Sequence, residues 1–185
     1  MKRGFYTIMC AQFLSSLADN ALLIAAIALL TSLSAPEWMT PLLKLFFVIS
    51  YILLAAWVGL FADLMPKGHV MFITNAVKVG GCLLMLFGSH PLISYAVVGI
   101  GAAAYSPAKY GILTELLPAE KLVIANGWIE GLTVVSIILG VVLGGVLVHP
   151  DVADTLMRVF HLEFFGVTNH AEAAIAMIVF IYAAA

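Results

Sequence analysis

The chain has 185 residues, of which 64% are apolar and 10% are charged, and its formal net charge is −2. Soluble proteins carry roughly a quarter of charged residues, so this composition excludes an ordinary soluble domain and predicts an integral membrane protein. A net charge near zero provides no basic footprint for DNA or RNA, and we therefore expect no nucleic-acid partner.

Long apolar runs follow one another along the chain, and one bilayer crossing needs about 20 such residues. Five runs reach this length and are predicted to span the membrane: Phe5–Leu33, Leu42–Leu64, Val70–Gly88, Leu92–Leu117 and Leu122–Val148. Residues 1–148 thus hold the first five transmembrane helices. A sixth run, Ala171–Ala185, is shorter and is interpreted as the truncated start of a sixth helix. The more polar residues 149–170 are expected to form a periplasmic connection.

The basic residues of the connections indicate an orientation, because Lys and Arg concentrate in cytoplasmic loops. Most of them fall on one predicted side of the membrane: Lys2, Arg3, Lys67 and Lys121. The opposite side carries Arg158, together with the connections at Trp38 and His90. We therefore expect the N-terminus to be cytoplasmic.

The fourth predicted span contains three residues that are unusual in a membrane helix, Pro107, Lys109 and Gly111. A proline removes a backbone donor and clashes with the preceding turn, so we expect the helix to bend or open there. A lysine at the helix centre costs at least about 2.5–3.5 kcal/mol, which makes Lys109 a candidate functional residue. The alternative is that Lys109 lies near the helix end and extends its ammonium group to the interface.

Four ionisable residues lie well inside predicted spans: Asp19, Lys78, Lys109 and Glu130. At about 1.5 Å per residue, Lys78, Lys109 and Glu130 come out near ~12 Å from the cytoplasmic ends and Asp19 near ~21 Å. Exposing such charges to lipid is unfavourable, so we expect them to face one interior or a water-filled cavity. Ion pairs that only hold helices together are the structural alternative.

Glycines four residues apart occur twice in the fifth span, as Gly127/Gly131 and Gly140/Gly144. Small residues at this spacing let helices approach closely, so we interpret both pairs as packing positions. The histidines lie in connections or at helix ends without metal-ligand spacing, so no metal site is predicted. No nucleophile–base arrangement is visible either, and we expect neither a cofactor nor an enzyme.

The turn between the second and third spans combines Gly59, Asp63 and Lys67. An acidic residue at a helix end can accept hydrogen bonds from a neighbouring helix and pair with a lysine. Such contacts suit a gate between two rigid bundles. A plain interfacial turn is the alternative.

Three stretches together resemble the bacterial lysophospholipid transporter family of the major facilitator superfamily: Ala11-Gln12-Phe13-Leu14-Ser15, Asp19-Asn20-Ala21-Leu22-Leu23 and the run from Gly101 to Leu113. The resemblance extends from about Ala11 to Val148. The Gly59/Asp63/Lys67 turn resembles the signature loop of the superfamily, with His69 where a second basic residue is usual.

The resemblance implies an all-α fold of twelve helices in two halves, of which this chain is the six-helix N-terminal half. It implies a carrier in the bacterial inner membrane that works by alternating access. The implied substrates are lysophosphatidylethanolamine and lysophosphatidylglycerol, moved to the cytoplasmic leaflet for reacylation. The implied partners are membrane lipid, the C-terminal six-helix half and an acyltransferase/acyl-carrier-protein synthetase.

On this interpretation Lys109 or Lys78 holds the lipid phosphate, and Asp19 or Glu130 holds an ethanolamine ammonium group. Asn20 and Tyr105, which stand in the resembling stretches, complete the expected substrate-binding set. Two other functions stay open: a carrier of the same fold for another amphiphile or a drug, and a membrane subunit that transports nothing.

Overall fold

The computed structural model describes residues 3–185, so Lys2 of the predicted cytoplasmic cluster lies outside the described residues. Its elements are α1 (Arg3–Ser32), α2 (Met39–Leu64), α3 (Lys67–Leu86), α4 (Pro91–Leu116), α5 (Ala119–Val148), α6 (Pro150–Phe160), the 3-10 helix η1 (Leu162–Phe165) and α7 (His170–Ala184). Within the described residues the fold is all-α, as predicted.

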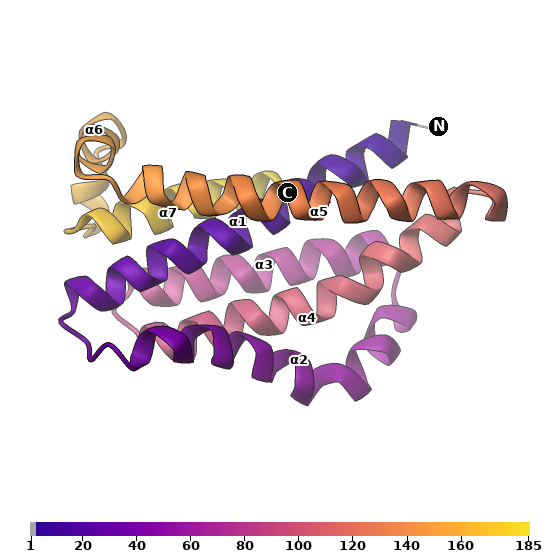
Figure 1. Ribbon diagram of the computed structural model, residues 1–185, viewed down its shortest axis with the longest axis horizontal. Helices are drawn as coiled ribbons and strands as arrows, with labels where there is room; N and C mark the ends of the chain where they lie inside the picture. The colour runs from indigo at the N-terminus through magenta and orange to yellow at the C-terminus, as the bar shows by residue number, and fades with distance from the viewer. Residues whose placement is uncertain (1–2) are drawn as a thin grey trace.

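Helices α1 to α5 are each long and apolar enough to cross a membrane, which confirms the five predicted spans to within a few residues. Helix α7 has only 15 residues, which is about 22 Å of helix against a hydrocarbon core of about 30 Å. Figure 1 shows the C-terminus midway along the bundle, whereas α1 to α5 run most of its length.

The long helices lie side by side (Figure 1), and α1 and α4 each pack against several of the others. Helix α1 packs most extensively against α5 and also contacts α7, while α4 packs against both α2 and α3. Helix α3 contacts α7, which closes the bundle on that side. Small and branched apolar residues fill the core between these helices, including fully buried Ala21 and Ala25 on α1 and Ile175 and Ile178 on α7.

One of the two predicted glycine pairs carries a close helix contact. A β-carbon added at Gly140 would lie 2.5 Å from the Leu17 carbonyl oxygen, and one at Gly144 would lie 2.7 Å from the Ala21 carbonyl oxygen. Only glycine therefore permits the observed approach of α5 to α1. The packing interpretation is wrong for Gly127 and Gly131 within this chain, because nothing lies within 4 Å of a β-carbon at either position.

Helix α4 continues without interruption through Pro107. Of the two expected outcomes, a bend or an opening, the opening is therefore wrong, while Figure 1 shows that α4 bends along its length. A proline lacks one backbone donor but leaves the rest of the ladder intact, so packing against α2 and α3 holds the helix together. The α4 backbone thus offers no pair of broken helix ends to a ligand.

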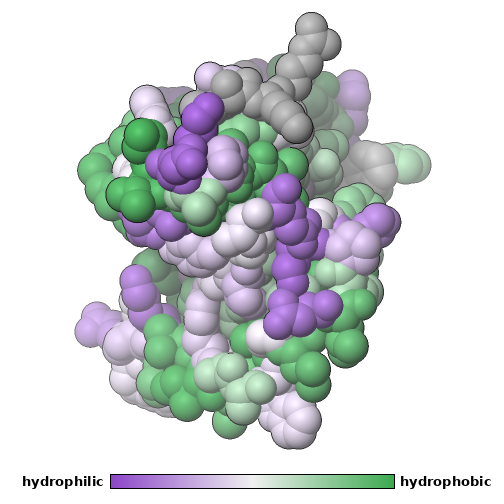
Figure 2. Space-filling view, turned by 90° about the vertical axis from the view of Figure 1, so that its right-hand side faces the viewer, coloured by the Kyte–Doolittle hydropathy of each residue, from purple (hydrophilic) through white to green (hydrophobic). Residues whose placement is uncertain are grey.

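The two ends of the bundle differ. Figure 2 views the end that carries the α2–α3 and α4–α5 turns, where hydrophilic side chains gather with hydrophobic ones around them. At the other end α6 runs across the bundle (Figure 1). The predicted connection, residues 149–170, contains helix α6 and the 3-10 helix η1. The His170 Nε2 atom lies 3.0 Å from the Asp154 carboxylate and ties α6 to the start of α7.

Candidate functional site

A small polar pocket of about 130 Å³ lies inside the apolar bundle. Five helices, α1 to α5, contribute its lining: Gln12, Ser15, Ser16, Asp19, Tyr51, Lys78, Ala102, Tyr105, Ser106, Lys109 and Thr133. The pocket thus brings together three of the four ionisable residues predicted to share an interior, and it adds Tyr105 of the expected binding set.

Lys78 and Asp19 form a buried ion pair. The Lys78 ammonium nitrogen lies 2.9 Å from the Asp19 carboxylate, and the Lys78 side chain is only 1% exposed. The same ammonium donates to Ser15 Oγ at 2.9 Å. The Tyr182 hydroxyl donates to the carboxylate at 2.7 Å, and the Lys78 nitrogen lies 4.9 Å from the centre of the Tyr105 ring.

This arrangement joins α1, α3, α4 and α7 at one point, which is the geometry of the alternative in which ion pairs hold helices together. The sequence-based depth count placed Asp19 well beyond Lys78. The structure instead pairs Asp19 with Lys78, because the long lysine side chain covers the difference in depth between the two backbones.

The Lys109 ammonium group in this pocket has spare hydrogen-bonding capacity. Its ammonium nitrogen lies 3.4 Å from Thr133 Oγ1 and 4.9 Å from the centre of the Tyr110 ring. Across residues 3–185 no carboxylate forms a salt bridge with it. An ammonium group has three donors, so the half-buried Lys109 presents free donors to an anion that enters the pocket.

Two members of the expected set lie outside this pocket. Glu130 is exposed and accepts a hydrogen bond from the Tyr110 hydroxyl. Asn20 is half-buried and donates to the Ser16 carbonyl oxygen at 2.8 Å, beside the contact between α1 and α5. Glu130 thus does not join the pocket that contains the other three charges.

The pocket also contains polar residues that sequence reasoning did not assign: Gln12, Ser15, Ser16, Tyr51, Ser106 and Thr133. A signal for the first helix was present, since Gln12, Ser15 and Asp19 recur at helical spacing and share one face of α1. Hydroxyl groups such as that of Thr133 carry no comparable signal, because a threonine in a membrane helix normally bonds its own backbone.

The Gly59/Asp63/Lys67 turn forms the expected pair. Lys67 Nζ lies 2.5 Å from the Asp63 carboxylate and donates to the Ala62 carbonyl oxygen at 2.7 Å. The Lys67 side chain passes over Gly111 of α4, where an added β-carbon would come within 3.1 Å of it. Gly59 makes no such contact. The Lys67 side chain thus places the turn against α4 at Gly111, two residues after Lys109.

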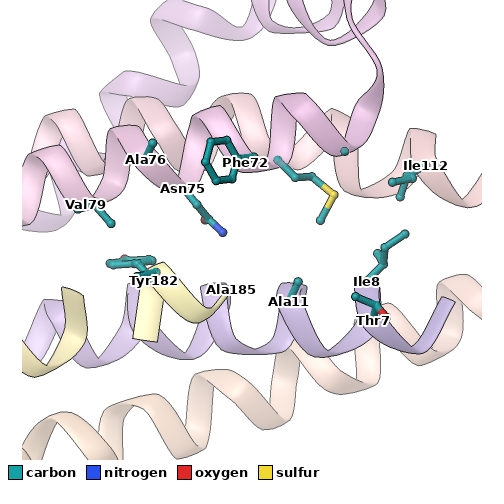
Figure 3. A pocket seen from close by; sticks show the side chains of 13 residues that line it. Thr7, Ile8, Ala11, Phe72, Asn75, Ala76, Val79, Ile112, Tyr182 and Ala185 are labelled. Atoms are coloured by element: carbon teal, nitrogen blue, oxygen red, sulfur yellow. The ribbon is translucent and has the colours of Figure 1, made fainter. Parts of the chain in front are cut away.

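A larger pocket lies elsewhere in the bundle. It measures about 440 Å³ and lies between α1 and α3, next to the end of α7 (Figure 3). Its lining is mainly apolar, with Ile8 and Phe72 from the two facing helices and Asn75 as one of its few polar members. Among the described residues no group of His, Cys, Asp or Glu has metal-ligand geometry.

Comparison with known proteins identifies the family. The model of the Major Facilitator Superfamily matches residues 8–184, which is nearly the whole chain. The chain belongs to the Major Facilitator Superfamily. This membership, together with five membrane-length helices, makes it a multi-pass membrane protein of the superfamily's fold.

Individual relatives in the superfamily narrow the resemblance. The chain is 50% identical over 147 residues to the lysophospholipid transporter LplT of Yersinia enterocolitica, a match that covers 80% of this chain and 36% of the relative. It is 52% identical over 155 residues to the LplT of Klebsiella pneumoniae, covering 84% and 39%. The chain thus spans less than two-fifths of the length of these relatives.

Proposed function

We propose that this chain is the N-terminal half of a bacterial inner-membrane carrier that moves lysophospholipids to the cytoplasmic leaflet by alternating access. The observation that carries the proposal is the polar pocket inside a mainly apolar bundle, with Lys109, which has no carboxylate partner among the described residues. The names of the relatives support the lipid, since each of them is called a lysophospholipid transporter.

In this proposal the Lys109 ammonium group binds the lipid phosphate, because it is half-buried and has no carboxylate partner within residues 3–185. The partly exposed Asp19 carboxylate faces the ethanolamine ammonium group. Lys78 positions Asp19 and does not itself bind the lipid, since two of its three donors are directed to Ser15 and Asp19 and its side chain is only 1% exposed. The acyl chain stays in an apolar groove or in lipid.

A second bundle completes the carrier in this proposal. Carrier sites of this kind lie near the midplane between two repeats, and the relatives are long enough to hold both.

The orientation and the partner belong to the same proposal. The turn at Lys67 and the turn at Lys121 share one end of the bundle, which we assign to the cytoplasm. There an acyltransferase/acyl-carrier-protein synthetase would reacylate the lipid that is delivered. In this proposal the carrier binds and moves the lysophospholipid, and the partner catalyses its reacylation.

The test is transport of lysophosphatidylethanolamine by the full-length carrier in proteoliposomes, measured by back-extraction of a labelled lipid with albumin. Lys109→Gln is expected to lower the rate at least tenfold, because a charge-assisted contact to phosphate is lost. Lys121→Gln is the matched control, since this exposed lysine lies outside the pocket, and it should transport normally. Equal rates for the two variants would contradict the assignment of Lys109.

A carrier of another amphiphile is the second candidate, and the same liposomes distinguish it. Movement of a cationic amphiphilic drug, without movement of any lysophospholipid by the wild-type protein, would replace the proposed substrate. The superfamily assignment would stand in that case.

A further inference from the structure

A buried hydrogen-bond acceptor in the polar pocket has no partner. Gln12 of α1 is only 1% exposed, and its amide nitrogen donates to Thr133 Oγ1 at 2.6 Å. Its amide oxygen Oε1 lacks a hydrogen-bond partner among the described residues. Leaving a buried acceptor unsatisfied is unfavourable, so this oxygen is a place where a ligand hydroxyl or a water binds well.

The orientation of the Gln12 amide follows from its neighbours. The Thr133 hydroxyl donates its proton to the Ile129 carbonyl oxygen at 2.8 Å. Thr133 Oγ1 is therefore an acceptor toward the pocket, and it also lies 3.4 Å from Lys109 Nζ. Only the amide nitrogen of Gln12 can face an acceptor, so Oε1 must be the atom left over.

A second unpaired group lies in the same pocket. Tyr105 is 5% exposed, and its hydroxyl makes no hydrogen bond with another described residue. The neighbouring Ser15 hydroxyl donates to Asn75 at 2.8 Å and accepts from Lys78. The Tyr105 ring lies against the Lys78 ammonium group, which holds the side chain in place. The pocket thus offers one free acceptor, one free hydroxyl and the spare donors of Lys109.

This set fits one feature of a lysophospholipid, and the inference rests on the proposed function. A lysophospholipid carries a free glycerol hydroxyl close to its phosphate, where a diacyl lipid carries an ester. We infer that Gln12 Oε1 accepts a hydrogen bond from this free hydroxyl while the Tyr105 hydroxyl donates to it, with the phosphate on Lys109. The two residues thereby select lipids with one acyl chain.

The preference for a lipid with a free hydroxyl over a lipid with an ester has a physical basis. An ester has no proton to donate, so a diacyl lipid leaves Oε1 unsatisfied, and a site built to bind a hydroxyl rejects analogues without it. The cavity of about 130 Å³ has room for a hydroxyl and its neighbouring carbons. Water satisfies the acceptor while the site is empty, and the lipid hydroxyl replaces it.

The experiment compares two lipids in the full-length carrier in proteoliposomes: lysophosphatidylethanolamine and its 2-deoxy analogue, in which hydrogen replaces the glycerol hydroxyl. The wild-type protein is expected to move the hydroxyl lipid at least tenfold faster. Gln12→Met should slow the hydroxyl lipid to the rate of the analogue and leave the analogue unchanged. Tyr105→Phe, which removes one oxygen and keeps the ring, should reduce the preference in the same direction.

Ser94→Ala is the matched control, because the Ser94 hydroxyl is another buried group without a partner among the described residues but lies outside this pocket. It should keep the full preference for the hydroxyl lipid.

Equal rates for the two lipids in the wild-type protein would overturn the inference and leave the carrier proposal standing. Equal slowing of both lipids by Gln12→Met would overturn it as well, since that result indicates a structural role. If the Gln12 variant does not fold, Tyr105→Phe decides alone, and an unchanged preference refutes the inference. Movement of neither lipid by the wild-type protein would refute the proposed function itself.

Discussion

Replacing Asp19 by asparagine should destabilise the chain strongly, because the change leaves the Lys78 ammonium group buried without a counter-charge. The Lys78 side chain is 1% exposed, so water cannot replace the lost carboxylate. At a separation of 2.9 Å and an effective dielectric constant of about 20, the pair attracts by about 6 kcal/mol. Desolvation of both groups offsets part of this attraction.

Removing one partner of a buried pair typically costs about 3–5 kcal/mol, which is a large part of a total stability of about 5–15 kcal/mol. For a chain of this length that loss lowers the melting temperature by about 6–20 °C. The double change of Asp19→Asn and Lys78→Met should recover much of it, because no charge then remains buried. The measurement is a thermal melt of the detergent-solubilised chain.

Lys109→Gln is the matched comparison, since it removes a half-buried lysine that has no carboxylate partner among the described residues. We expect its melting temperature to stay within about 2 °C of the wild type, as for surface changes of about ±0.5 kcal/mol. A wild-type melting temperature for Asp19→Asn, or an equal loss in both single variants, would refute the distinction between clamp and free cation.

Three further outcomes follow from the packing and the turns. Gly140→Ala should destabilise the fold by about 1–3 kcal/mol, because the new β-carbon would meet the α1 backbone. Gly127→Ala on the same helix should be neutral or stabilising, and thermal melts of this chain measure both. Gly111→Val should displace the Lys67 side chain and slow lysolipid transport by the full-length carrier without abolishing lipid binding; unchanged transport would remove the turn from the gate. In a chain without native cysteines, a cysteine at His90 should react with an impermeant reagent in intact cells and one at Lys67 should not; the reverse pattern would invert the orientation.

Sequence alone determined the membrane class, the five spans and the identity of the charged residues inside them. The reason is that a bilayer imposes a length and an apolar composition on each crossing, and both are local properties of the chain. Lys109 and the Gly59/Asp63/Lys67 turn stand out in the sequence for the same reason, since each departs from its immediate apolar surroundings. The resembling stretches indicated the superfamily to which the chain belongs.

Tertiary structure decided which of these residues meet. Counting residues from a helix end estimates depth, but it contains neither the direction of a side chain around the helix nor the identity of the neighbouring helix. Depth grouped Glu130 with Lys78, whereas helix rotation exposes Glu130 and turns Lys78 toward Asp19.

The same limit explains the glycines and the pocket. Gly127 and Gly140 have the same spacing pattern in the sequence, but only Gly140 faces α1, because Gly127 lies on the exposed side of α5. Gln12 has an unpaired oxygen only because Thr133, 121 positions away in the sequence, faces its nitrogen. A local sequence pattern does not show which distant helices are in contact. Only the folded chain therefore shows which hydrogen-bonding groups remain free for a ligand.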